Sequence, residues 1–233
     1  VVRDDGRPTY LLADIAYHLD KFDRGYDRII DIWGPDHHGY IARIAGALSA
    51  FGYSSDRFKV LIAQQVNLLA GGELVKMSKR LGNFSKMKDL IEEIGTDVSR
   101  YFFVMRSMES HLDFDLELAK KQSSENPVFY LQYAHARISS VAREAEKQNI
   151  APDESGKAVE HLSNPEARAL LTLIAKYPDE ITDAAANLEP HRITNYLMRI
   201  AQAYHKFYFE HRILTEDAAR SAAFLGLCFA TRL

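Results

Sequence analysis

Two apolar, β-branched segments on either side of one helix-length segment most strongly constrain what this chain can fold into. Residues 28–33 (RIIDIW) and 58–66 (FKVLIAQQV) have the composition of buried strands, and residues 40–51 between them have the pattern of a helix. A strand–helix–strand unit of this length forms a crossover in a parallel sheet. Ligands of such sheets bind beyond the carboxyl ends of the strands, so the segments that follow these strands are candidate site segments.

Three further local patterns lie in the same half of the chain. We expect residues 9–12 to form a short strand and residues 15–22 to form an amphipathic helix. Gly71 and Gly72 interrupt the apolar run that precedes them, which is typical of a hairpin turn. This half of the chain therefore has an α/β pattern.

The second half of the chain has no strand pattern after about residue 116. A long apolar-periodic run opens at Asn126-Pro127, and residues 149–165 have the composition of a loop. Further helices are expected at residues 166–176, 179–186, 191–210 and 216–233. The fold class predicted is an α/β parallel-sheet domain over residues 1–112 followed by an all-α helical bundle over residues 113–233.

Composition excludes several classes of protein. The 233 residues are 47% hydrophobic and 26% charged, which is ordinary for a globular protein. No apolar run is long enough to span a membrane, and the single cysteine excludes an internal disulfide and is compatible with the cytoplasm. The net charge of −3 argues mildly against nucleic-acid binding, although it does not exclude a local basic patch. Because the chain begins without methionine and its last helix has no cap, we expect it to be part of a longer protein.

A basic run follows the glycine hairpin. Lys76, Met77, Ser78, Lys79 and Arg80 are consecutive, and two lysines on an exposed loop can bind the oxygens of a triphosphate. They can also stabilise the charge that develops on a leaving pyrophosphate. The alternative interpretation is an ordinary solvated surface turn.

Residues 34–39 (GPDHHG) lie at the carboxyl end of an expected strand. Gly34 lets the backbone approach a ligand closely, and Asp36 can accept hydrogen bonds from ribose hydroxyls. His37 and His38 could instead cap the following helix. A zinc site is the weakest alternative, because adjacent histidines rarely face one metal ion and no further ligands stand at the spacing such a site needs.

Tyr10 and Asp14 are four positions apart and can converge on one pocket. A carboxylate that accepts two parallel hydrogen bonds, with an aromatic ring alongside, is the best protein partner for a guanidinium group. Asp14 could equally be an N-terminal helix residue favoured by the helix dipole.

Aromatic residues are frequent in two expected helices of the second half. Tyr133 and Arg137 lie in residues 125–137 (ENPVFYLQYAHAR), and Tyr204 and Tyr208 lie in residues 204–209 (YHKFYF). Exposed aromatic rings stack on unpaired nucleic-acid bases, and Tyr204 and Tyr208 share a helix face. Aromatic residues at helical spacing are more often part of a core.

These motifs together resemble the arginyl-tRNA synthetases, a family of class I aminoacyl-tRNA synthetases. Residues 76–80 (KMSKR) resemble the class I KMSKS loop, and residues 33–40 (WGPDHHGY) look like the arginyl version of the motif that holds the adenylate. The Tyr-x-x-x-Asp pair is similar to the segment that binds the arginine side chain, and residues 125–137 closely resemble the start of the anticodon-binding domain. The resemblance extends from residue 9 to about residue 233.

The resemblance implies a Rossmann-type catalytic domain and a role for each matching residue. These roles are catalysis for Lys76, Ser78 and Lys79; arginine binding for Tyr10, Asp14 and His37; ATP or adenylate binding for Gly34, Asp36, His38, Val66 and Met77; and tRNA binding for Tyr133, Arg137, Tyr204 and Tyr208. It further implies ATP as a substrate, Mg²⁺ bound with ATP, tRNA(Arg) as a partner, no membrane association, and a cytoplasmic, monomeric intact enzyme.

The resemblance also implies a two-step reaction, in which arginine and ATP form arginyl-adenylate and the arginyl group then passes to the terminal adenosine of tRNA. The HIGH motif of class I enzymes is absent from the chain, so we expect these 233 residues alone not to form the adenylate. The alternatives are a different class I synthetase, such as the cysteinyl or methionyl enzyme, and a non-catalytic tRNA-binding paralogue.

Overall fold

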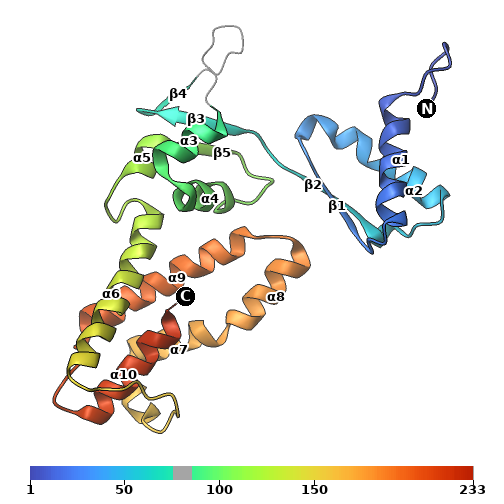
Figure 1. Cartoon of the computed structure of the whole chain (residues 1–233). Helices are drawn as coiled ribbons and strands as arrows, with labels where there is room; N and C mark the ends of the chain where they lie inside the picture. The colour runs from blue at the N-terminus through green and yellow to red at the C-terminus, as the bar shows by residue number, and fades with distance from the viewer. Residues whose placement is uncertain (76–85, 233) are drawn as a thin grey trace. The chain divides into compact units, whose positions relative to one another are not determined.

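A computed structural model describes residues 1–75 and 86–232, and these residues divide into two compact units (Figure 1). The first unit comprises residues 1–67 and 108–113, and the second comprises residues 68–107 and 114–233. The expected division at residues 1–112 and 113–233 stays a prediction. In the structure, residues 68–107 belong to the same compact unit as the helices that follow residue 114.

The first unit is a strand–helix–strand arrangement covered by a further helix. Its elements are α1 (Tyr10–Asp23), β1 (Ile29–Trp33), the short 3-10 helix η1 (Pro35–Tyr40), α2 (Ile41–Ala50), η2 (Ser55–Arg57) and β2 (Phe58–Ile62). Strands β1 and β2 pair in parallel, with Ile29 opposite Phe58 and Trp33 opposite Ile62, as the sequence predicted. The core combines both helices and both strands and contains Ile15, Phe22, Ile29, Ile44, Leu48 and Phe58.

Two expected strands differ from those observed. The strand expected at residues 9–12 is wrong, because α1 begins at Tyr10 and its buried residues Ile15, His18 and Phe22 continue one helical face. The strand expected at residues 58–66 is two strands, since β2 ends at Ile62 and β3 (Val66–Ala70) begins at Val66. Between them the backbone N–H of Ala63 bonds to Trp33, whereas that of Gln64 bonds to Met108, so the chain changes partners there.

The glycine hairpin is confirmed. Strand β3 pairs antiparallel with β4 (Glu73–Leu74), and β5 (Leu112–Asp115) pairs on the other side of β3. Gly71 and Gly72 have φ angles of 62° and 81°, a left-handed conformation that favours glycine at both central positions of such a turn.

The second unit is mainly helical. Its helices are α3 (Met87–Ile94), α4 (Thr96–Val104), α5 (Leu116–Lys120), α6 (Pro127–Lys147), η3 (Val159–Leu162), α7 (Pro165–Ala175), α8 (Tyr177–Asn187), α9 (His191–Glu210) and α10 (Ala218–Thr231). Helix α6 begins where the sequence predicted, because the Asn126 side chain accepts a hydrogen bond from the Val128 N–H and Pro127 occupies the first turn. Helix α9 has the expected bounds.

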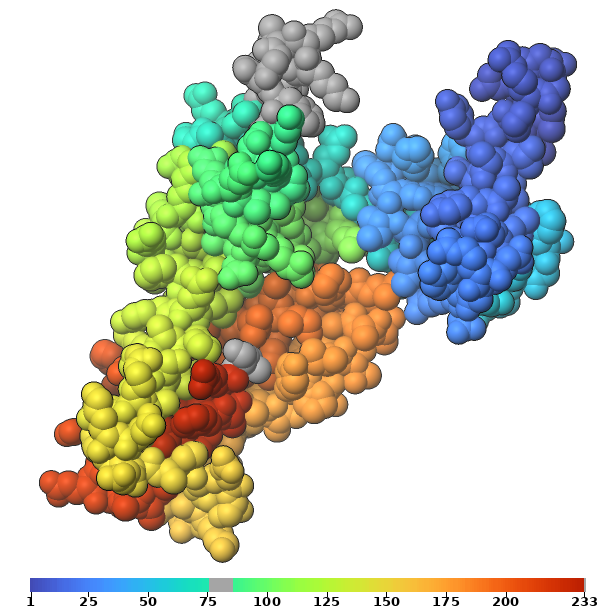
Figure 2. Space-filling view, viewed as in Figure 1, coloured from blue at the N-terminus to red at the C-terminus, as the bar shows by residue number. Residues whose placement is uncertain are grey.

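The core of this unit lies among α6, α7, α9 and α10 and includes Ile138, Leu170, Tyr204, Phe207 and Phe224. Figure 2 shows α10, in red, directly beside α6, in yellow-green, as their packing contacts require. Within the part of the chain that the structure describes, no helix has both the length and the apolar composition needed to cross a bilayer.

Candidate functional site

Tyr10 and Asp14 lie one turn apart in α1, and both side chains are exposed, Tyr10 to 83%. A spacing of four residues puts a phenol and a carboxylate on the same side of a helix. The first turn of α1 contains no acidic residue. Asp14 therefore lies beyond the region where the helix dipole stabilises a negative charge, and the alternative explanation of its position loses its support.

The turn after β1 brings Gly34, Asp36 and His37 together. The carboxylate of Asp36 lies over Gly34, because a Cβ at Gly34 would come within 2.8 Å of Asp36 Oδ1. The other carboxylate oxygen is 3.5 Å from Nε2 of His37, whose ring lies between Trp33 and Tyr40 at centroid distances of 6.4 and 6.2 Å. Asp36 and His37 are both exposed, so the turn presents acceptor and donor groups to solvent.

The alternatives for His37 and His38 find no support in the structure. Neither η1 nor α2 has a side-chain cap hydrogen bond in the described residues, so the histidines cap neither helix. Over residues 1–75 and 86–232 there is no group of three His, Cys, Asp or Glu side chains that could hold a metal ion. His38, like its neighbours, is exposed.

The remaining predicted nucleotide contacts lie partly outside the described residues. Val66 is the first residue of β3 and is 41% exposed. Lys76, Met77, Ser78, Lys79 and Arg80 lie outside the residues that the structure describes, so their roles at the phosphates stay predictions. The structure shows no direct contact between Tyr10 or Asp14 and His37 within residues 1–75.

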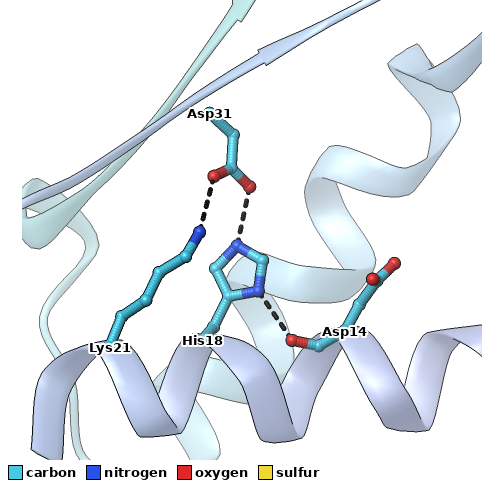
Figure 3. A network of polar contacts seen from close by, with 4 residues as sticks. All are labelled: Asp14, His18, Lys21 and Asp31. Atoms are coloured by element: carbon cyan, nitrogen blue, oxygen red, sulfur yellow. Dashed lines mark hydrogen bonds and ion pairs between the residues drawn. The ribbon is translucent and has the colours of Figure 1, made fainter.

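A buried polar network behind Asp14 was not predicted from the sequence (Figure 3). Nε2 of His18 lies 2.6 Å from Oδ2 of Asp31, and Nδ1 lies 2.7 Å from the backbone carbonyl of Asp14. Lys21 donates to the second oxygen of Asp31 across 3.2 Å. His18 is 3% exposed and the side chains of Asp31 and Lys21 are 10% and 19% exposed, so the network joins helix α1 to strand β1 in a largely buried position.

The charges of this network follow from its geometry. Burial lowers the pKa of His18, but the hydrogen bonds to Asp31 and to the Asp14 carbonyl, together with the charge of Asp31, outweigh burial and raise that pKa above its ordinary value. Burial likewise raises the pKa of Asp31, whereas His18 and Lys21 lower it, and the net pKa of the carboxyl is below its usual value. His18 and Asp31 therefore each favour the charged form of the other.

In the second unit, three of the four predicted tRNA contacts lie in one cluster on α6 and α9. The guanidinium of Arg137 lies 4.3 Å from the ring centroid of Tyr133 and 4.9 Å from that of Tyr208. It donates hydrogen bonds to the Tyr133 hydroxyl and to Nδ1 of His205, each across 3.1 Å. Tyr133 is 46% exposed. Arg137 thus holds two aromatic rings in place, and part of the cluster stays open to solvent.

His205 belongs to this cluster but was not selected from the sequence. Its ring stacks on Tyr133 at 5.8 Å, and its Nε2 lies 3.3 Å from the backbone carbonyl of Tyr130. Burial lowers the pKa of His205, and the charge of Arg137 lowers it further, against the raising effect of the Tyr130 carbonyl. The only sequence signal was its place within the aromatic run of residues 204–209, which does not reveal a partner on another helix.

The prediction that Tyr204 contacts tRNA is contradicted by its burial. Tyr204 is 0% exposed and lies in the core with Phe207 and Cys228, whereas Tyr208 lies one turn further along α9 beside Arg137. A ring without accessible surface cannot stack on a base. The face shared by Tyr204 and Tyr208 is partly a packing face, which the spacing alone could not reveal.

Comparisons with known proteins agree with this arrangement. The DALR anticodon binding domain family matches residues 131–233. An arginine–tRNA ligase from Leptospira interrogans is 55% identical over 100% of this chain, and one from Desulforamulus reducens is 50% identical over 100% of it. The chain spans 40% of the length of the first relative and 42% of the second.

A solved structure is also similar to this chain over nearly its whole length. An arginyl-tRNA synthetase structure from Campylobacter jejuni matches with a TM-score of 0.83 and 37% sequence identity, over 99% of this chain and 50% of that chain. The similarity therefore covers both units, including the Tyr10–Asp14 helix and the turn at Gly34. This chain belongs to the arginyl-tRNA synthetase family, and its residues 131–233 form a DALR anticodon binding domain.

Proposed function

We propose that the intact protein containing this chain is an arginine–tRNA ligase, which activates arginine with ATP and transfers the arginyl group to tRNA(Arg). The observation that carries the proposal is the exposed pair of Tyr10 and Asp14, one turn apart on α1. Asp14 accepts two hydrogen bonds from the guanidinium of the substrate, and the Tyr10 ring lies alongside.

The turn after β1 holds the adenylate end of the substrate. Gly34 leaves room for the backbone to approach the ligand, and Asp36 accepts hydrogen bonds from the ribose hydroxyls. His37, whose Nε2 is 3.5 Å from Asp36, donates to the arginine carboxyl group or the phosphate in this proposal. The backbone of Val66 contacts adenine, and His38 is a further contact of the adenylate.

ATP enters with Mg²⁺ as a substrate complex. Lys76, Ser78 and Lys79 bind its phosphates, and Met77, between Lys76 and Ser78 in the sequence, contacts the nucleotide. Catalysis consists of positioning the arginine carboxylate against the α-phosphate and stabilising the charge on the leaving pyrophosphate. The intact ligase is proposed to act as a monomer in the cytoplasm, where a free thiol such as that of Cys228 persists.

The cluster of Tyr133, Arg137, His205 and Tyr208 is proposed as the tRNA-binding surface of the DALR domain. Its half-exposed Tyr133 ring offers a stacking surface to an unpaired base, at about 1–3 kcal/mol per base. Two hydrogen bonds and two ring contacts hold Arg137, so it orients the rings more than it reaches for a phosphate.

Arginine-dependent exchange of pyrophosphate into ATP, measured with the intact ligase, tests the role of Asp14. Asp14→Asn removes the charge and one acceptor, and we expect the KM for arginine to rise at least about tenfold, with the KM for ATP changed by less than about twofold. Asp20→Asn, an exposed carboxylate on the same helix, is the matched control. An unchanged KM for arginine in the Asp14 variant would contradict the proposal.

A further inference from the structure

The buried network of the first unit contacts Asp14, the residue whose carboxylate the proposed function bonds to the guanidinium. His18 donates from Nδ1 to the backbone carbonyl of Asp14, whereas the Asp14 side chain points away into solvent (Figure 3). The same imidazole contacts Asp31 through Nε2. A single ring therefore connects the backbone of Asp14 with the middle of strand β1.

Both contacts require the ring to donate. A backbone carbonyl and a carboxylate oxygen accept hydrogen bonds and cannot donate them, so His18 carries a proton on each nitrogen. The acceptor distances of 2.7 and 2.6 Å are short, as expected for charge-assisted bonds. The side chains of Asp31 and His18 are largely buried, 10% and 4% exposed, so solvent screens the pair little.

Strand β1 leads directly into the adenylate turn. Asp31 lies two residues before Trp33, and Gly34 and Asp36 follow within the next three positions. The His18 link thus fixes the backbone at the arginine end of the proposed site against the strand that supports the adenylate end. Misplacement of a binding group by about 1 Å can cost up to about a hundredfold in rate.

We propose that His18 and Asp31 are positioning residues for arginine recognition: they hold Asp14 of α1 at a fixed place relative to the Gly34–Asp36 turn. The inference rests on the proposed function, because it assigns Asp14 to the substrate guanidinium. Lys21 supports the pair by occupying the second oxygen of Asp31. Neither His18 nor Asp31 contacts the substrate, so neither is a catalytic residue.

Two substitutions at His18 separate its two contacts. In His18→Asn the side-chain amide takes the place of Nδ1 and keeps the bond to Asp14, but it is too short to reach Asp31. In His18→Gln the amide takes the place of Nε2 and keeps the bond to Asp31, but it loses the bond to Asp14. Because the link needs both ends, each variant of the intact ligase is expected to raise the KM for arginine about tenfold in pyrophosphate exchange.

The kcat and the KM for ATP are expected to stay within about twofold in both variants. A loss that came from general instability would reduce the amount of active enzyme, which lowers the apparent kcat and leaves the KM for arginine unchanged, so this split separates positioning from folding. Asp20→Asn on the same helix is the control and is expected to leave the three parameters unchanged. If the His18 variants do not give folded protein, the isosteric Asp31→Asn provides the same test from the strand side.

The double variant His18→Gln/Asp14→Asn decides whether His18 acts through Asp14. If it does, the double variant has nearly the KM for arginine of Asp14→Asn alone, because the neutral side chain has already lost the charged, two-acceptor contact that its position serves. Multiplication of the two single effects would overturn the inference. So would an unchanged KM in both His18 variants while Asp14→Asn raises it. An unchanged KM in Asp14→Asn itself would refute the proposed arginine contact, and with it this inference.

Discussion

Arg137 of α6 donates a hydrogen bond to Nδ1 of His205 on α9 across 3.1 Å. A guanidinium group cannot accept, so Nδ1 must be unprotonated and His205 must be neutral, with its proton on Nε2 facing the Tyr130 carbonyl. His18 is the opposite case, because both of its nitrogens face acceptors. The first unit thus contains a buried histidine whose two nitrogens both donate, and the second contains a half-buried histidine that is neutral.

The first prediction concerns the pH dependence of these histidines. The pKa of His205 is lowered in the folded chain, so the unfolded chain binds more protons. The stability that His205 contributes is therefore present above its unfolded pKa of about 6.5 and is lost as the pH falls below it. The raised pKa of His18 has the opposite effect, with stability present below about 6.5 and lost as the pH rises through the folded value.

NMR titration of the ring protons measures both pKa values directly. We expect His205 to titrate below and His18 above the ordinary histidine value of about 6.5. In Arg137→Gln the charge beside His205 is removed, and the pKa of His205 should move upward. A pKa of His205 above its ordinary value of about 6.5 would contradict the hydrogen-bond assignment.

The second prediction concerns Tyr133 in tRNA binding. Tyr133→Ala removes the exposed ring, and the affinity of the intact ligase for tRNA is expected to fall about tenfold, as the loss of one stacked base would produce. Tyr133→Phe keeps the ring and loses only the hydroxyl that accepts from Arg137, so its affinity should change by less than about threefold. Filter binding at one fixed salt concentration measures both. Equal losses in the two variants would exclude stacking as the role of the ring.

The third prediction concerns the start of α6. Asn126 is 3% exposed, and its side chain accepts from the Val128 N–H and donates to the carbonyls of Ala119 and Lys121. Asn126→Ala leaves these buried groups without partners and is expected to cost about 2–4 kcal/mol of unfolding free energy.

Asn164→Ala is the matched control, because Asn164 caps α7 with a single bond to the Ala167 N–H. Its expected cost is about 1 kcal/mol. Denaturant unfolding followed through the helical signal compares the two variants. A smaller loss for Asn126→Ala than for Asn164→Ala would show that the extra bonds do not contribute.

The fourth prediction concerns Gly226 in α10. A Cβ at this position would come within 2.7 Å of the backbone oxygen of Asp153. The backbone N–H of the same residue donates a hydrogen bond to the carbonyl of Ala222 in α10, which holds Asp153 against the helix. Gly226→Ala must displace that backbone, and we expect a loss of about 1–3 kcal/mol.

Gly46→Ala in α2 is the control for Gly226→Ala. Nothing lies within 4 Å of a Cβ at Gly46, so alanine there is expected to stabilise the first unit by about 0.5–1 kcal/mol. Thermal unfolding of the two variants gives the comparison. Stabilisation by Gly226→Ala would mean that Asp153 can move away freely.

The sequence was sufficient for the long helices of the second unit because each carries its own boundary signals. Asn126-Pro127 and the periodic run of α9 are local features, and local features determine helix starts and lengths. The strand expected at residues 9–12 failed because a run of four residues such as Thr-Tyr-Leu-Leu does not distinguish a strand from the first turn of a helix.

The side-chain pairs that organise the candidate sites could not be predicted, because they join distant positions. His18 and Asp31 are 13 residues apart and Arg137 and His205 are 68 apart, so only the packing of the helices and strands brings them together. Tyr204 failed for a related reason, since helical spacing identifies a shared face but not what covers it. Tyr10, Asp14, Gly34 and Asp36 were recognisable because their motifs are continuous in sequence.

The most direct test of the account is the charging of tRNA by the intact protein that contains this chain, with each of the twenty amino acids labelled in turn. We expect arginine alone to be attached, with ATP required, and Asp14→Asn to abolish most of this charging at low arginine concentration. Charging with methionine or cysteine would identify a different class I synthetase, and binding of tRNA without any charging would identify a non-catalytic paralogue. Either result would contradict the assignment of Tyr10 and Asp14 to the guanidinium of arginine.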